Sequence, residues 1–168
     1  RWSLPQPARW AWDGRNGTLS QACLRSTDGG DLCADADWPR RGLDLQGDKL
    51  PLALAAPYLP ARDNGRPWAL HGQIDLTAQL RPAGNAWRGN VKLTSAAGGM
   101  RNRARARRDL LSYRDLVLEA TFDPQRIDAR LGSVFDDSGR IDTHIATGWD
   151  EHAPLDGQLR IKTDELTW

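Results

Sequence analysis

The chain has 168 residues and a formal net charge of +1, with 23 Lys and Arg residues against 22 Asp and Glu residues. This near-neutral balance argues against a nucleic-acid binder, which needs a clustered basic excess to contact phosphates. Only 32 residues are Leu, Ile, Val or Phe, which excludes a thick core and favours one row of buried aliphatic side chains per strand. No apolar run approaches the roughly 18 residues of a membrane span, and we interpret the chain as a fragment of a longer protein.

Residues 1–17 contain several Pro and Trp residues and predict an irregular lead, followed by a single β domain over residues 18–168. Within the domain, apolar and polar residues alternate in segments bounded by Gly, Pro or Asp, which predicts strands joined by turns. The predicted strands cover residues 18–25, 31–38, 42–46, 68–81, 87–94, 114–123, 125–135, 139–149 and 155–163. The run LPLALAAPYLP at residues 50–60 has three prolines and mixed spacing, which suits one or two helical turns covering an end of the sheet.

The two cysteines lie in the first predicted hairpin. If its turn is centred on Asp28, Cys23 faces Cys33 directly across the hairpin, and Leu24 pairs with Leu32 on the opposite face. A cross-strand disulfide is therefore geometrically plausible and would contribute about 2–3 kcal/mol. Its formation would imply an oxidising compartment, and the alternative is a pair of small buried thiols in a reducing cytosol.

Strands that recur every 12–20 residues without an amphipathic helix between them predict an antiparallel meander. A degenerate repeat accompanies them, reading GQIDL, GNVKL, GRIDTHI and GQLRI from residues 72, 89, 139 and 157. Such repeats are typical of elongated structures in which each unit packs on its neighbours, although a β-sandwich would alternate similarly. The residues expected to share the apolar interior are Leu70, Ile74, Leu76, Leu80, Val91, Leu93, Leu116, Leu118, Phe122, Ile127, Leu131, Ile141, Ile145, Leu159 and Ile161.

The sequence carries no recognisable catalytic constellation, so we predict a non-enzymatic protein without a metal or cofactor. The histidines His71, His144 and His152 are far apart and lack the spacing and the local Cys and Glu partners of a metal site. The segment Asp136-Asp137-Ser138-Gly139 could suggest calcium binding or acid–base chemistry, but it is typical of a hairpin turn. Gly98-Gly99 is likewise predicted to be a turn.

The only charge cluster comprises the arginines of residues 101–108. The even spacing of Arg101, Arg103, Arg105 and Arg107 would place four guanidinium groups on one face of an extended segment. That row could contact lipid phosphates or an acidic partner. We favour the alternative, a solvated edge that discourages aggregation between sheets. Most of the eight tryptophans fall at or beyond strand ends, where a half-polar ring suits a wet rim.

The hairpin with its Cys pair, the run LPLALAAPYLP, the segment LHGQIDLTAQL and the later GQLRIKTDEL, in that order, resemble the C-terminal region of TamB-family proteins over residues 18–166. The resemblance implies a β-taco, a sheet folded lengthwise around an aliphatic interior. It also implies a periplasmic location in a parent protein anchored in the inner membrane of a Gram-negative bacterium. Members of the family work with TamA, an outer-membrane barrel of the BamA type. The arginine cluster matches no motif of the family.

We therefore expect an all-β antiparallel meander folded lengthwise into an elongated trough with an apolar interior, the alternative being a β-sandwich. The resemblance implies that the trough shields phospholipid acyl chains or nascent outer-membrane protein strands, and so supports phospholipid transport and outer-membrane protein assembly. The expected partners are acyl chains, the TamA barrel through the parent protein, and nascent outer-membrane proteins, with no nucleic acid. The alternative function is a structural spacer or a protein-binding β-sandwich module.

Overall fold

A computed structural model describes residues 1–60, 62, 65, 67–84, 86–136, 139–149 and 154–163. The strands are β1 (Trp2–Ser3), β2 (Trp10–Trp12), β3 (Gly17–Ser26), β4 (Asp31–Trp38), β5 (Gly42–Pro51), β6 (Ala69–Ala83), β7 (Ala86–Arg101), β8 (Leu111–Phe122), β9 (Arg126–Phe135), β10 (Gly139–Gly148) and β11 (Asp156–Thr163). A 3₁₀ helix, η1 (Leu52–Tyr58), connects β5 to β6, as the Pro-rich run predicts.

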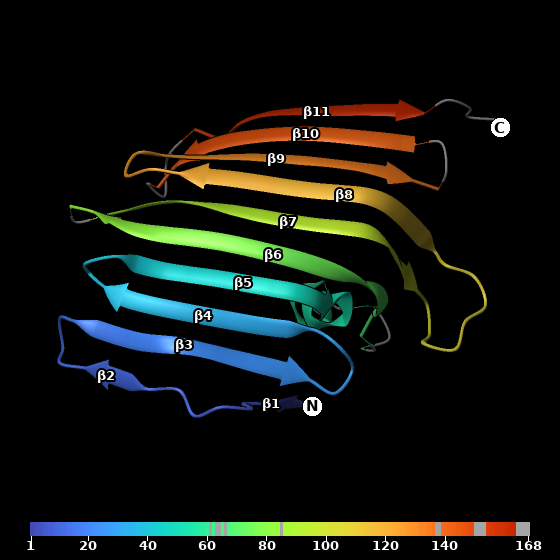
Figure 1. Cartoon of the computed structure of the whole chain (residues 1–168). Helices are drawn as coiled ribbons and strands as arrows, with labels where there is room; N and C mark the ends of the chain where they lie inside the picture. The colour runs from blue at the N-terminus through green and yellow to red at the C-terminus, as the bar shows by residue number, and fades with distance from the viewer. Residues whose placement is uncertain are drawn as a thin grey trace.

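The strands form one open antiparallel sheet in the order β1-β3-β4-β5-β6-β7-β8-β9-β10-β11, and β2 pairs with the free part of β3 (Figure 1). From β3 onward each strand pairs with the strand that follows it in the chain. The predicted all-β antiparallel meander is thus confirmed. The alternative of a β-sandwich is wrong, because every described strand belongs to this one sheet, which does not close into a barrel.

The strand registers give the sheet one apolar and one polar face, because residues paired across antiparallel strands point to the same side. Leu76 pairs with Leu93, Leu93 with Leu118, and Leu118 with Leu131. We call the side that carries this row the apolar face. The residues next to these leucines in the sequence, Thr77, Lys92, Glu119 and Arg130, pair in a second row that points to the other side of the sheet. We call that side the polar face.

The core of the protein is thin. Among the described apolar residues only Leu50, Ala78 and Ala146 are buried, and no described side chain is less than 2% exposed. Helix η1 packs against β6, but no second layer of described residues lies over the sheet. The apolar face is therefore a surface over most of its area, in agreement with the small number of aliphatic residues in the sequence.

Strands β5 and β7 extend well beyond their predicted ends, because irregular residues interrupt the alternation without ending the pairing. Strand β5 continues from residue 46 to Pro51 through a register shift at which Lys49 adopts a φ of 50°. Strand β7 continues from residue 94 to Arg101. The prediction of a turn at Gly98-Gly99 is therefore wrong: both glycines lie in β7 and pair with β6 and β8.

The lead is more ordered than expected. Trp2 and Ser3 pair with the end of β3, and Trp10 to Trp12 pair with its beginning. Both short strands lie along the same edge of β3, as Figure 1 shows at the bottom of the sheet. Residues 1–17 are thus not irregular throughout, since their two strands extend the sheet edge.

Candidate functional site: an open apolar face

The strand registers place the fifteen residues predicted to share an interior on the apolar face. Most follow directly from the pairs between neighbouring strands, ending with Ile141 opposite Ile161 and Thr143 opposite Leu159. Leu70 lies beyond a register shift in β6 and pairs with Met100. The Tyr113 ring, on the same side as Met100, reaches back to place its hydroxyl 2.9 Å from Ser95 Oγ. That these residues line a ligand-holding groove stays a prediction.

The apolar face also includes leucines of β4 and β5 that the sequence reading did not assign to it. Leu43 pairs with Leu80, Leu45 pairs with Ala78, and Leu32 pairs with Gly47. The sequence did contain the pattern that indicates this face, because apolar and polar residues alternate in residues 42–46 as clearly as in the later strands. The short length of that segment concealed its continuity with the rest of the face.

Exposure of the apolar face increases toward the β11 edge. Leu93, Leu118 and Leu131 in the middle of the sheet are half-buried by their neighbours on the same face. On β11, Leu159 and Ile161 are 62% and 59% exposed. A contiguous aliphatic surface of this kind on a protein is characteristic of a site that binds another apolar surface or ligand.

Aromatic residues border the apolar face at one end of the strands, which we call the Trp end. There Trp38 stacks on Trp87 with ring centroids 3.8 Å apart, and Phe122 meets Trp149 edge-to-face at 6.1 Å. The Trp149 indole N–H donates to the carbonyl of Asp123 at 2.6 Å. Trp87 and Trp149 remain 42% and 52% exposed, so this end presents amphipathic rings to solvent.

The opposite strand ends, which we call the Arg end, carry the arginine cluster. The predicted extended row is wrong, because β7 ends at Arg101 and residues 102–110 form a loop with a turn in which the Ala106 amide donates to the Arg103 carbonyl. Arg101 Nε donates to Asp109 Oδ1 at 2.6 Å, and His71 Nε2 lies 2.8 Å from Asp109 Oδ2. The Arg101 hydrogen bond, with His71 beside it, lowers the pKa of Asp109.

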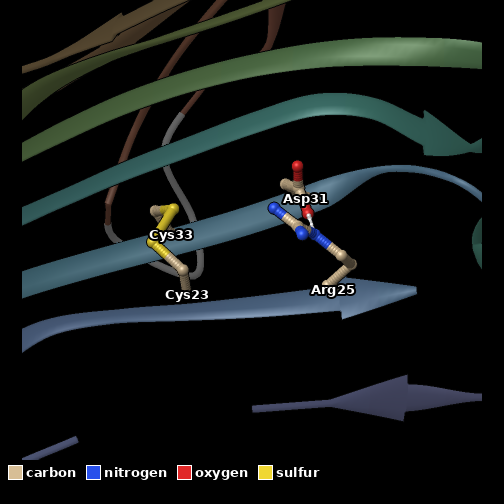
Figure 2. The surroundings of a disulfide bond; sticks show 4 residues. All are labelled: Cys23, Arg25, Asp31 and Cys33. Carbon is tan, nitrogen blue, oxygen red and sulfur yellow. Dashed lines mark hydrogen bonds and ion pairs between the residues drawn. A yellow bond between two sulfur atoms is a disulfide. The ribbon is translucent and has the colours of Figure 1, made fainter. Parts of the chain in front are cut away.

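The disulfide joins β3 to β4 on the polar face. Cys23 pairs with Cys33 across the hairpin, with Cα atoms 4.0 Å apart, and the predicted register of Leu24 opposite Leu32 is also confirmed. Figure 2 shows the bond beside Arg25, whose Nε donates to Asp31 at 2.8 Å. This pairing raises the pKa of Arg25. The covalent link and the ion pair together fix the register that directs Leu24 and Leu32 to the apolar face.

The two described histidines each have a carboxylate partner. His71 contacts Asp109, as above, and His144 Nε2 lies 2.9 Å from Asp128 on the polar face; the hydrogen bond from His144 lowers the pKa of Asp128. His152 lies outside the described residues, as do Asp137 and Ser138. Within the described part of the chain, no three His, Cys, Asp or Glu residues are grouped to hold a metal ion.

Asp136 accepts hydrogen bonds from the backbone and hydroxyl of Ser112 at 3.1 and 3.0 Å. Its carboxylate therefore ties the beginning of β8 to the end of β9. With a φ of 44°, Asp136 adopts a left-handed conformation that suits a turn. These contacts give the residue a structural role at the hairpin.

The polar face carries a shallow hollow of about 350 Å³ over Gly132, where the absence of a side chain leaves space. Acidic Glu119 and Asp142 and basic Arg130 and Arg160 line it together. Lys92 lies 2.8 Å from Glu119 and lowers its pKa. Because charges of both signs are interspersed, the hollow favours neither an anionic nor a cationic ligand.

Comparison of the chain with protein-family models, with curated proteins and with solved structures gave no match. No helix in the described part is both long and apolar enough to cross a membrane. The resemblance to the TamB family therefore stays a prediction, which rests on the sequence motifs.

Proposed function

We propose that the apolar face holds phospholipid acyl chains, and that the chain is a periplasmic segment of a TamB-like, envelope-spanning protein. The observation that carries this proposal is the continuity of the face. Aliphatic side chains follow one another from Leu32 on β4 to Ile161 on β11, and no described layer covers them. The disulfide supports an oxidising compartment such as the periplasm.

The function needs no covalent chemistry. Burial of a lipid chain contributes about 0.8 kcal/mol per methylene group, which is enough to hold a long acyl chain against water. Because the lining residues are mostly Leu, Ile and Val, neighbouring positions offer similar environments. Free-energy barriers between them are then small, and a chain can move along the face while its headgroup stays in water.

The same face could shield nascent outer-membrane protein strands, which also expose aliphatic side chains on one side. In this proposal the parent protein works with the TamA barrel, and the segment supports phospholipid transport and outer-membrane protein assembly. The open β11 edge, next to exposed Leu159 and Ile161, would allow a client strand to pair with the sheet.

Site-specific photo-crosslinking in cells tests the proposal. A photoreactive residue at Leu118 would lie on the apolar face, because Leu118 pairs with Leu93 and Leu131. Val117 is a matched control on the polar face, where it is 38% exposed and pairs with Thr94 and Gly132. Adducts are identified by mass spectrometry.

Phospholipid adducts at Leu118 and not at Val117 are the expected result. Adducts to outer-membrane proteins at Leu118 would favour the client-strand role. Crosslinks confined to the protein itself would contradict both roles and favour the structural spacer.

A further inference from the structure

The β7–β8 loop concentrates positive charge that the rest of the chain lacks. Residues 101–109 contain five arginines and one aspartate, a formal charge of +4, whereas the whole chain carries +1. All other residues together therefore carry −3. This local excess of positive charge at one end of the sheet creates an electrostatic site for an anion.

Both stems of the loop are anchored. Asp109 is held by Arg101 and His71, as described above, at the stem next to β8. At the other stem, the Arg62 guanidinium donates to the carbonyl and the side-chain oxygen of Asn102. Arg62 also lies over the Trp68 ring at 5.0 Å. The loop is thus fixed to β6, β7 and the segment after η1.

Four guanidinium groups remain available on the anchored loop. Arg103, Arg105, Arg107 and Arg108 are exposed. Within the described residues, no hydrogen bond or ion pair engages their side chains. A guanidinium group binds phosphate oxygens in a bidentate manner and is easily desolvated compared with an ammonium group.

Arginines at the Trp end differ, because carboxylates already neutralise several of them. Arg41 contacts Asp35 and Asp37, Arg81 contacts Asp44 at 2.6 Å, and Arg126 contacts Asp128. The two ends of the strands therefore offer different surfaces: the Trp end has several arginines neutralised by carboxylates, whereas the loop at the Arg end adds four arginines that pair with no described residue.

The loop adjoins the apolar face directly. Leu70, Met100 and Leu111 pair in one row as the last apolar row before the loop. Leu110, the last loop residue, is 57% exposed. In Figure 1 the loop reaches beyond the right-hand ends of the neighbouring strands. If the acyl chains of a lipid lie on the apolar face and its headgroup extends past the Arg end, the guanidinium groups of the loop lie next to that headgroup.

We propose that the β7–β8 loop binds the headgroup of anionic phospholipids, and so orients bound lipids with their phosphates at the Arg end. This inference rests on the proposed function. It adds the class of the bound lipid and the orientation of that lipid on the apolar face. The anchored stems keep the loop in place, and the four exposed arginines supply the charge. Preference for a net negative headgroup follows because a zwitterionic headgroup repels arginine with its own cationic group.

Binding of soluble short-chain phospholipids to the 168-residue protein tests the inference. Short-chain phosphatidylglycerol and phosphatidylcholine, each below its micelle concentration, are titrated by calorimetry. The loop variant replaces Arg103, Arg105, Arg107 and Arg108 with Gln. A control variant replaces four exposed arginines elsewhere, Arg9, Arg15, Arg88 and Arg160, with Gln, which changes the net charge equally. Circular dichroism verifies that both variants fold.

We expect the wild type and the control variant to bind phosphatidylglycerol about tenfold more tightly than phosphatidylcholine, and the loop variant to bind both equally. The preference should decrease with added salt. Equal binding of both lipids by the wild type would overturn the inference and leave the proposed function standing. If neither phosphatidylglycerol nor phosphatidylcholine bound to the wild type, the proposed function would be overturned as well.

Two further titrations distinguish the source of the phosphate. Inorganic phosphate binding as tightly as phosphatidylglycerol would overturn the inference, because the apolar face would then contribute nothing. A single-stranded oligonucleotide that competes more strongly than the lipid would also overturn it, in favour of nucleic acid. Loss of the preference in the control variant would show that net charge, and not this loop, is responsible.

Discussion

Trp38 and Trp87 stack with their ring centroids 3.8 Å apart and their planes at 24°, although they belong to strands β4 and β7, which are not neighbours. Strands β5 and β6 lie between them. At a strand spacing of about 4.8 Å, the backbones of β4 and β7 would be about 14 Å apart in a flat sheet. The two indole side chains thus span two strands and connect four of them at the Trp end.

We expect Trp87→Ala to destabilise the protein by about 1–3 kcal/mol, because it removes the stacking contact and part of the burial of Trp38. The free energy of unfolding in urea measures the effect. Tyr58→Ala is the control: Tyr58 is 89% exposed, and its loss should cost no more than about 0.5 kcal/mol. Equal losses in both variants would show that the stack contributes little to stability.

Reduction of the disulfide should lower the free energy of unfolding by about 2–3 kcal/mol. The Cys23–Cys33 bond limits the freedom of the unfolded chain and fixes the β3–β4 register. Urea unfolding with and without a reducing agent measures the change. A Cys23→Ser, Cys33→Ser double variant should match the reduced protein and show no further response to the reductant. A stability unaffected by reduction would contradict the prediction.

Substitution of Gly98 should be poorly tolerated. A Cβ atom there would collide with the Tyr113 ring and with the carbonyl of His71, so Gly98→Ala should destabilise the protein by about 1–3 kcal/mol. Gly132→Ala provides the matched control in β9, since its added Cβ would meet only Asp142 Oδ1 at 3.5 Å, an ordinary contact. Thermal unfolding of the two variants separates these outcomes, and similar melting temperatures would refute the steric argument.

Acid should weaken the protein partly through Asp109. Because hydrogen bonds from Arg101 and then His71 hold the pKa of this carboxyl below its usual range, its ionised form stabilises the fold. That contribution is present above the unfolded pKa of about 3.9 and is lost as pH falls through the folded pKa. Stability of Asp109→Asn should therefore vary less with pH below about 4. Asp48→Asn, which removes no described hydrogen bond or ion pair, should retain the dependence of the wild type.

The part of the first hairpin next to its turn could be predicted from the sequence, whereas the register shift between Leu19 and Ala22, which moves the remaining pairs by one residue, could not. Its turn residues and the alternation on both sides specify one register, which pairs Cys23 with Cys33 and Leu24 with Leu32. The apolar face of β6 to β11 was predictable for the same reason, since strict alternation determines which side each residue occupies. The meander then follows from short connections between successive strands.

Features that depend on irregular or distant residues could not be predicted. The left-handed Lys49 and the register shift in β6 at Gly72 interrupt the alternation, so the ends of β5 and β7 were underestimated. Even spacing of arginines suggested an extended row, but the contact of Arg101 with Asp109 closes a loop instead. Stacking between Trp38 and Trp87 connects residues whose proximity no local pattern encodes.

The pairing of each strand with its successor determines how the protein can fold. Contacts between successive strands close short chain loops, so no pairing has to wait for a distant segment to be synthesised. From β3 onward, each hairpin can add to the sheet already formed, in the order of the chain. A substitution that disrupts one strand would therefore divide the sheet into two parts, and each part would keep its own strand pairings. The growing sheet exposes an aliphatic surface at every step, and folding in the presence of an apolar ligand or of a chaperone would protect it from aggregation.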